Sequence, residues 1–441
     1  MKRLLLLSSA TALSACNLAP TYVRPAAPVP TTWPAGTAYR AASATEKAGL
    51  PWTSLVGDAR LKTIIERALT NNRDLRVALA NVLAARAQYR VQRAAQLPSI
   101  TTDADASLTR RNGSRQDSYS ADIGFSGFEI DLFGRLRNLS EAALQTYLGT
   151  QEGARAARIA LVAETANAYA TLAADQQLLA LSRETLASAE RTLTLTRTLN
   201  NAGLSGKLDV HQAETIVEQA RSDLAAATTQ VAQDRNAIDL LTGAPVEEAL
   251  LPGSLGGLIA ATAQVPAGLS SEILLQRPDV LQAEHALMAA NADIGAARAA
   301  MFPRISLTAA IGVASSALSS LFSGDAFAWS AAPAASLPIF GGGLRANVDY
   351  SKAQRDAALA SYEGAIQSAF RDVADGLARA GTIDDQQRAQ RALVVANQKA
   401  YALSEERYRA GIDTFLSTLV AQRSLYAAHR SAIATDLDLV Q

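Results

Sequence analysis

The sequence predicts a mainly α-helical protein that also contributes strands to a membrane β-barrel. Two observations favour this fold class: stretches free of proline that are much longer than a globular domain needs, and shorter segments in which apolar and polar residues alternate. A third observation is an internal repeat that brings both features back once. We therefore expect long coiled-coil helices and four strands per chain, in two tandem structural repeats.

The composition fits closely packed helices. Of the 441 residues, 49% are hydrophobic and only 5% are aromatic, and the apolar content leans on Ala and Leu. Ala favours helices and lets their backbones approach closely. The 41 basic side chains balance 41 acidic ones, so nothing in the charge points to nucleic acid as a partner.

The N-terminus has the pattern of a secretory signal. Basic residues precede a short apolar run, too short for a membrane helix, and Leu13-Ser14-Ala15-Cys16 follows it. This segment resembles the lipobox of bacterial lipoproteins, which implies that residues 1–15 are removed and that the Cys16 thiol is acylated. Asn17 beside it favours sorting to the outer membrane. The alternative is an ordinary signal peptide with an incidental cysteine.

The rest of the chain divides into a tether and two repeats. Residues 16–60 form the acylated tether, which we expect to be extended because it is rich in proline. Residues 61–250 form repeat 1, residues 251–270 a linker, and residues 271–441 repeat 2. Chance similarity between Ala-rich helices would not keep the matching turns in order. The matching pairs are Asp74–Ile100 with Asp279–Ile305, Leu132–Gly134 with Ile339–Gly341, and Asn201–Gly203 with Arg409–Gly411.

Each repeat contains one very long helix. No proline occurs from Leu136 to Leu199, and within this stretch leucines recur every seven residues from Leu172 to Leu193, which favours a left-handed supercoil. About 60 helical residues reach roughly 90 Å. The stretch from Leu344 to Arg409 is the counterpart in repeat 2.

Each repeat also contains two segments with the period of β-strands. In the second segment of repeat 1, the alternation of apolar and polar residues slips by one residue at Gly127. Their lengths, near ten residues, fit strands that cross a bilayer at a tilt. An alternative is a transmembrane helix over the uncharged residues 305–324, although many serines make that stretch poorly apolar. The four strand segments are Ser99–Thr109, Ser118–Leu132, Arg304–Val313 and Phe327–Ile339.

Four strands cannot cross a membrane alone, because an open sheet leaves unpaired backbone groups in hydrocarbon. Closure must come from other copies of the chain. Three copies supply twelve strands, enough for a barrel with an aqueous lumen.

Several motifs together resemble the outer-membrane factor family, the TolC-like and OprM-like efflux lipoproteins of the NodT type. They are the tether sequence Pro20–Pro25, the segment Gln276–Val280, the segment Leu337–Gly343, and the two helical hairpin turns Gly203–Glu214 and Arg407–Leu425. The resemblance covers almost all of the mature chain.

The resemblance implies a homotrimer with a 12-stranded barrel in the outer membrane and a helical barrel in the periplasm. Such a trimer is a passive exit duct of a tripartite efflux system. It opens at its periplasmic tip when a periplasmic adaptor (membrane fusion) protein docks, and an inner-membrane pump, of the RND type, drives transport. Alternatives are a duct for type I secretion or metal export, or an envelope lipoprotein that braces without forming a pore.

Five residues are expected to form the periplasmic gate. Asp413 lies where OprM-like members carry a constricting acid, so three copies would form a ring of carboxylates. By the same resemblance, Tyr408 and Asp209 link neighbouring helices in the closed state through a charge-assisted hydrogen bond. Arg407 and Arg409 are candidate ion-pair partners in this latch.

The two hairpin turns are expected to bind the adaptor. Gly203 and Gly411 occupy left-handed positions at helix ends, which also explains them as ordinary helix caps. Leu204, Lys207 and Ile412 lie beside them and complete the expected docking surface.

The sequence contains no pattern typical of an enzyme. The three histidines are scattered without metal-ligand spacing, and the lone cysteine excludes an intramolecular disulfide. Ser205-Gly206-Lys207 lacks the rest of a phosphate-binding loop. We therefore expect no cofactor besides the lipid on Cys16.

Overall fold

The computed structural model describes residues 17–39, 51–261 and 270–441, and the predicted acylation site at Cys16 lies outside them. The chain divides into two compact units. Unit 1 comprises Met1–Val29, Leu79–Ala154 and Leu275–Ser368, and unit 2 comprises Pro30–Ala78, Arg155–Leu274 and Ala369–Gln441. Each unit draws on both halves of the chain, and each is described by itself.

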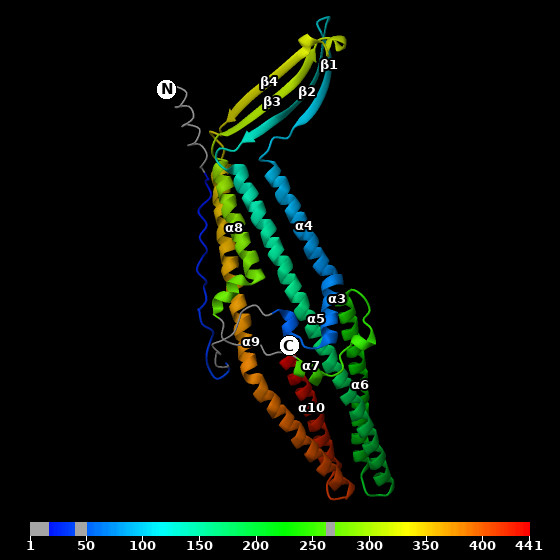
Figure 1. Ribbon diagram of the computed structural model, residues 1–441. Coiled ribbons are helices and arrows are strands. Elements are labelled where there is room, and N and C mark those ends of the chain that lie inside the picture. The colour runs from blue at the N-terminus through cyan, green and yellow to red at the C-terminus, as the bar shows by residue number, and fades with distance from the viewer. Residues whose placement is uncertain (1–16, 40–50, 262–269) are drawn as a thin grey trace. The chain divides into compact units, whose positions relative to one another are not determined.

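The elements follow one another along the chain in alternating groups of helices and strands (Figure 1). They are α2 (Trp52–Leu55), α3 (Ala59–Asn71), α4 (Arg73–Ala94), β1 (Thr101–Arg111), β2 (Ser114–Ile130), α5 (Arg135–Asn201), α6 (Lys207–Thr242), η2 (Glu248–Leu250), α7 (Leu255–Ala261), η3 (Ser271–Gln276), α8 (Pro278–Ala299), β3 (Arg304–Ser315), η4 (Leu318–Ser320), η5 (Gly324–Ala326), β4 (Phe327–Ser336), α9 (Gly343–Arg409) and α10 (Phe415–Val440).

The two longest helices confirm the predicted rods. Helices α5 and α9 have 67 residues each and coincide with the two stretches without proline. Of the leucines that recur every seven residues, Leu172 and Leu179 are buried. None of the helices within residues 17–39, 51–261 and 270–441 carries an apolar stretch of membrane-crossing length.

In unit 1 the four predicted strands form one antiparallel sheet in the order β1-β2-β3-β4 (Figure 1). The segment over residues 305–324 is mostly strand β3 rather than the alternative helix. The expected slip at Gly127 is a β-bulge between Phe125 and Phe128, and Gly127 has a φ of 65°, which glycine adopts without steric cost. In the described residues the outer edges of β1 and β4 have no strand partner.

The register gives the sheet one apolar and one polar face. Side chains alternate across a sheet, so residues paired in register share a face. On one face Ile123 pairs with Ile311, which pairs with Trp329, and all three are largely exposed. On the other face Asp103 pairs with Asp122, which pairs with Gly312.

The core of unit 2 joins short helices to the long ones. Leu61, Ile64 and Ile65 of α3 pack with Tyr169 of α5 and Ile238 of α6. In contrast to the expected tether boundary at residue 60, helix begins at Trp52 and again at Ala59.

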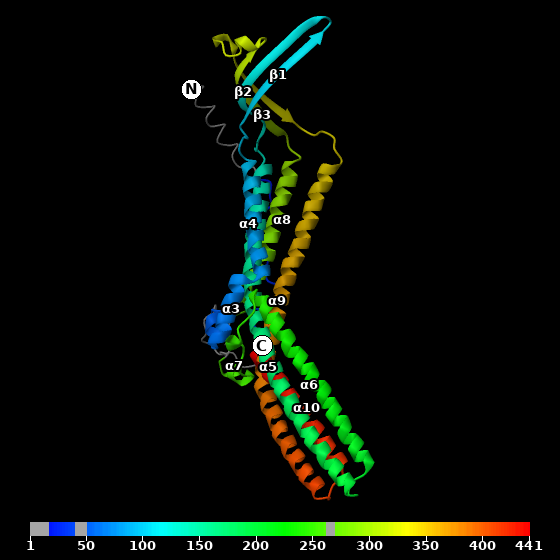
Figure 2. The same cartoon turned by 90° about the vertical axis from the view of Figure 1, so that its right-hand side faces the viewer.

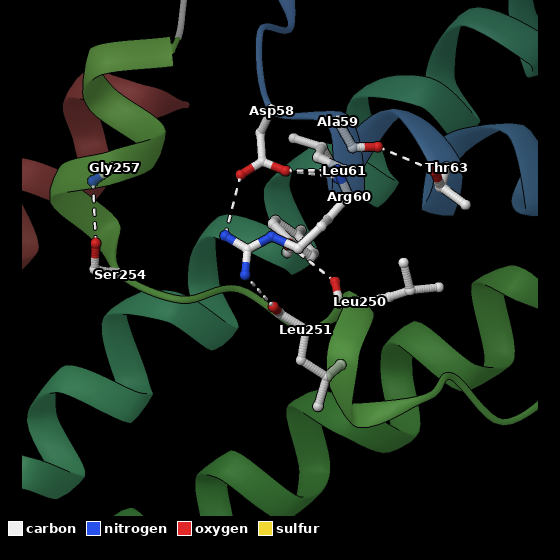
Figure 3. A network of polar contacts seen from close by, with 10 residues as sticks. Asp58, Ala59, Arg60, Leu61, Thr63, Leu250, Leu251, Ser254 and Gly257 are labelled. Atoms are coloured by element: carbon white, nitrogen blue, oxygen red, sulfur yellow. Dashed lines mark hydrogen bonds and ion pairs between the residues drawn. The ribbon is translucent and has the colours of Figure 1, made fainter.

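Polar contacts fix the start of α3 in this core (Figure 3). The Asp58 carboxylate accepts hydrogen bonds from the backbone N–H groups of Arg60 and Leu61, which caps the helix N-terminus. The Arg60 guanidinium donates to the Leu251 carbonyl at 3.3 Å, and the Tyr169 hydroxyl donates to the Leu250 carbonyl at 3.0 Å. The backbone after α6 is thereby attached to both α3 and α5.

Candidate functional site: the tip of the helical hairpins

The turn between α5 and α6 and the turn between α9 and α10 lie at the same end of unit 2 (Figure 2). Gly203 has a φ of 76° and Gly411 a φ of 70°, which confirms the predicted left-handed caps. Leu204 N–H donates to the Leu199 carbonyl at 2.8 Å, and Ile412 N–H donates to the Arg407 carbonyl at 2.9 Å. The two turns are therefore copies of one helix-ending motif.

A small apolar cluster holds the two hairpins together just behind these turns. Its buried members are Ala213 of α6, Tyr408 of α9 and Phe415 of α10. The rings of Tyr408 and Phe415 lie 5.4 Å apart, and the two residues are 5% and 1% exposed. Leu193, Leu195 and Leu199 of α5, Ile216 of α6 and Leu419 of α10 surround them. All four helices of the tip thus meet at Tyr408.

Within this chain Tyr408 and Asp209 do not bind each other. The Tyr408 hydroxyl donates to the Thr196 hydroxyl of α5 at 3.4 Å. The Asp209 carboxylate instead accepts a hydrogen bond from the Gly206 N–H at 3.3 Å, at the start of α6. A negative charge is stabilising at this position because it lies at a helix N-terminus. A contact between Tyr408 and Asp209 of neighbouring copies stays a prediction. Sequence reasoning missed Thr196, which carries no signal of its own inside a long helix.

Arg407 and Asp413 form a bidentate ion pair across the turn between α9 and α10. Arg407 Nε donates to Asp413 Oδ2 at 2.6 Å, and Nη2 donates to Oδ1 at 2.9 Å. The hydrogen bond from Arg407 lowers the pKa of the Asp413 carboxyl, so the carboxylate stays ionised at neutral pH. Arg409 pairs with Glu405 one turn back along α9, at 2.6 Å. Of the two arginines, only Arg407 reaches the predicted constriction acid.

The first turn has its own charged group, which sequence reasoning did not identify. Arg197 of α5 donates to Glu214 of α6 at 2.8 Å, and His211 lies 3.0 Å from the other oxygen of the same carboxylate. These contacts, led by the one from Arg197, lower the pKa of Glu214. The ion pair joins α5 to α6 within the first hairpin.

The outermost side chains are exposed, as a docking surface requires. Leu204 is 75% exposed and Ile412 is 64% exposed, and Lys207 is also exposed. Leu208 and Leu416, each one turn further in, are exposed apolar residues that the sequence analysis did not single out. Both turns therefore present leucine or isoleucine to the surroundings.

A groove of about 430 Å³ runs between α6 and α10 behind the tip. Its walls include Gln212, Gln219, Gln422 and Tyr426. Gln422 is buried, and neither the nitrogen nor the oxygen of its amide has a hydrogen-bond partner in the described part of the chain. A buried amide of this kind is stabilised by a partner that both donates and accepts.

In the described residues no three His, Cys, Asp or Glu side chains lie close enough together to hold a metal ion. The arrangement at the tip consists of apolar packing, caps and ion pairs. These contacts join the helices of the two hairpins at the tip.

Comparison with known proteins groups this chain with outer membrane channels. The family model "Outer membrane efflux protein" matches residues 64–244 and 269–441. The probable efflux pump outer membrane protein TtgC of Pseudomonas putida is 46% identical over 438 residues, which cover 96% of this chain and 90% of that protein. Outer membrane protein OprJ of Pseudomonas aeruginosa is 44% identical over 426 residues, covering 95% of this chain and 88% of that protein.

Solved structures agree with these sequence matches. A membrane protein from Pseudomonas aeruginosa superposes with a TM-score of 0.89 at 42% identity, covering 96% of this chain and 97% of that one. The open state of the MtrE outer membrane channel of Neisseria gonorrhoeae gives a TM-score of 0.85 at 35% identity, covering 96% of each chain. The chain therefore belongs to the outer membrane efflux protein family.

Proposed function

We propose that this chain is the outer-membrane exit duct of a tripartite efflux system, a passive channel that an adaptor protein opens at the periplasmic tip. The observation that carries the proposal is the four-stranded sheet, which has one apolar and one polar face and whose two edges pair with no other strand among the described residues. An exposed apolar face on a sheet is typical of strands that face lipid, and the polar face then lines an aqueous lumen.

Closure of the sheet calls for further copies of the chain. The free edge of β1 can pair with the free edge of β4 from a neighbour, because each presents a row of backbone donors and acceptors. Three copies give a barrel of twelve strands, wide enough for a lumen. A homotrimer with this barrel in the outer membrane, helices in the periplasm and an acyl group on Cys16 is the assembly we propose.

The gate is proposed to lie at the tip. Opening the α9–α10 hairpin relative to the α5–α6 hairpin has to separate Tyr408 from Ala213 and from the leucines of α5. The Arg407–Asp413 pair stiffens the turn between α9 and α10, and three such turns around an axis would set the charge at the constriction.

The adaptor is proposed to dock on the two turns, at Gly203, Leu204, Lys207, Gly411 and Ile412. Exposed apolar side chains are typical of a surface that a protein partner covers, and the buried Gln422 amide in the nearby groove has no hydrogen-bond partner among the described residues. An inner-membrane pump of the RND type would supply the energy. Relatives are named for the efflux of toluene, solvents and antibiotics, so we propose small organic compounds as cargo rather than metal ions or secreted proteins.

Photo-crosslinking in living cells tests this proposal. A photo-reactive residue at Lys207 or Ile412 is expected to capture a periplasmic adaptor protein, identified by mass spectrometry. The matched control is Ser114, the first residue of β2 beside the β1–β2 turn, which the proposed topology places outside the cell and which should capture no adaptor. If a folded protein captures only cell-wall-associated proteins from the tip, the bracing lipoprotein is the better interpretation.

A further inference from the structure

Residues 17–29, here called the strap, lie along α8 in unit 1 (Figure 1). They make contacts at successive levels of that helix. Arg298 donates to the Leu18 carbonyl at 3.1 Å, and Asn291 donates to the Pro20 carbonyl at 2.7 Å. Further down the helix, Glu284 binds side chains of the strap. Each of Arg298, Asn291 and Glu284 lies about two helical turns from the next, so all three lie on the same side of α8. The strap therefore runs along this side toward the N-terminal end of the helix.

The backbone of the strap touches the backbone of α8 at Gly295. A Cβ atom at this glycine would lie 2.8 Å from Ala19 Cα and 2.7 Å from Ala19 Cβ, which is too close for any side chain. The same Cβ atom would lie 2.6 Å from the Asn138 amide nitrogen. Glycine therefore makes room for the strap, and the contact is part of the packed structure of unit 1.

Glu284 holds the strap with an almost fully buried carboxylate, 2% exposed. Arg24 Nε donates to Oε1 and Arg24 Nη2 donates to Oε2, both at 2.6 Å. The Tyr22 hydroxyl donates to Oε1 at 3.0 Å. Burial, and then the hydrogen bond to Glu284, raises the pKa of Tyr22, so the phenol keeps the proton that it donates. Without the strap this carboxylate would lose the charged partner that compensates its burial.

We propose that Glu284 is the positioning residue of the N-terminus, and that the docked strap holds the N-terminus in place whether or not the acyl group is present. Only the part of the proposal that concerns the membrane rests on the acylation of Cys16 proposed above. The strap keeps Leu18, two residues from that cysteine, beside the C-terminal end of α8, which ends at Ala299 shortly before β3 begins at Arg304. The acyl chain would then enter the membrane at the level where strands begin, at a height set by protein contacts.

Limited proteolysis of the purified full-length protein tests this proposal. Chymotrypsin can cleave after Tyr22 in the strap and after Tyr39, which belongs to unit 2 and serves as the internal reference. We expect the wild type to resist cleavage after Tyr22. Glu284→Gln, which keeps the shape but loses the charge, should raise the rate of that cleavage at least tenfold relative to Tyr39. Glu141→Gln, an exposed change on α5 of the same unit, should leave the ratio unchanged.

Two further variants separate the strap from the lipid and from general damage to the fold. Cys16→Ser, exported through an ordinary signal peptide, should keep the wild-type resistance at Tyr22. Arg24→Gln lies on the strap itself and should expose Tyr22 without altering helix packing. The double variant Arg24→Gln/Glu284→Gln should be no more sensitive than the single variants, because both remove the same contact.

The outcomes are distinct. Loss of resistance in Cys16→Ser, or unchanged cleavage in Glu284→Gln and Arg24→Gln, would overturn the proposal. The mass of the released fragment that ends at Tyr22 reports acylation separately. A fragment without an acyl group would refute the acylation of Cys16. The ratio of cleavage after Tyr22 to cleavage after Tyr39 would still report whether the strap is docked.

Discussion

Replacing Tyr408 tests whether apolar packing or hydrogen bonding holds the tip together. Tyr408→Ala removes the ring that contacts Phe415 and the α5 leucines, whereas Tyr408→Phe removes only the hydroxyl. Both variants keep the charges of the turn, including Arg407 and Asp413. The pair of variants therefore separates two contributions that a single substitution would mix.

The structure predicts very different magnitudes for the two changes. Truncating a fully buried aromatic side chain to Ala costs about 3–5 kcal/mol. If the ring is buried only when the hairpins are together, this cost shifts the closed–open balance of one protomer by roughly 100- to 1,000-fold or more. The hydroxyl makes one hydrogen bond at 3.4 Å, a long one, so its loss costs about 1 kcal/mol or less, under tenfold.

Single-channel recording in planar lipid bilayers measures this balance directly. We expect Tyr408→Ala to raise the open time and the mean conductance strongly, and Tyr408→Phe to stay close to the wild type. Leu204→Ala, at an exposed position of the first turn, is the control that should leave conductance unchanged. Equal opening by Phe and Ala at position 408 would refute the packing argument and assign the latch to the hydroxyl.

Other expected outcomes concern the charged residues and the effect of pH. Tyr408→Phe combined with Asp209→Ala should give a higher conductance than either single variant, since the second change also removes the carboxylate that accepts from the Gly206 N–H in the first turn of α6, which is worth about 0.3–1 kcal/mol. The hydrogen bond from Arg407 lowers the pKa of Asp413, so their pairing persists at neutral pH and is lost only when the pH falls below the ordinary range of an Asp carboxyl; acid-induced opening in recordings should therefore vanish in Asp413→Asn. Burial and the neighbouring Asp234 raise the pKa of Asp175 to about 6, above its unfolded value, so folding stability should increase as pH falls from about 7 toward 4. Asp175→Asn should abolish that trend and raise the free energy of unfolding at pH 7.5 by about 1–2 kcal/mol, measured as a higher thermal midpoint.

A last expectation concerns the contact between β2 and β3. A Cβ atom at Gly312 would lie 2.2 Å from the Ala121 carbonyl oxygen. Gly312→Ala should therefore weaken the pairing of these strands and lower the temperature at which the proposed trimer dissociates on a semi-native gel, whereas Gly324→Ala, in open space, should not. Equal dissociation temperatures for the two variants would contradict the close approach.

The long elements could be predicted because their signals are local. Absence of proline over α5 and α9 and alternation in the strands reflect the helix and sheet periods directly. The strand β2 nevertheless begins at Ser114, earlier than predicted. Asn112 and Gly113 both have positive φ and form a two-residue hairpin turn, which lets pairing continue to the end of β1. Asn112-Gly113 is itself a hairpin signal in the sequence, and it places the turn before Ser114.

The contacts at the tip and along the strap could not be predicted in the same way. Thr196 and Tyr408 are far apart in the chain, and only the packing of α5 against α9 brings them together. The Arg407–Asp413 pair depends on the left-handed turn at Gly411, which folds the chain back on itself. Glu284 is one acid among many in the sequence, and its burial follows from the position of the strap on α8.

The most direct test of the central claim is bilayer recording of the purified wild-type protein together with its Tyr408→Ala variant. We expect the wild type to insert as a channel that is mostly closed, and the variant to show the same unit pore with a much larger open fraction. Absence of conductance from both, in protein that is folded and inserted, would contradict the claim that this chain forms a duct gated at its helical tip.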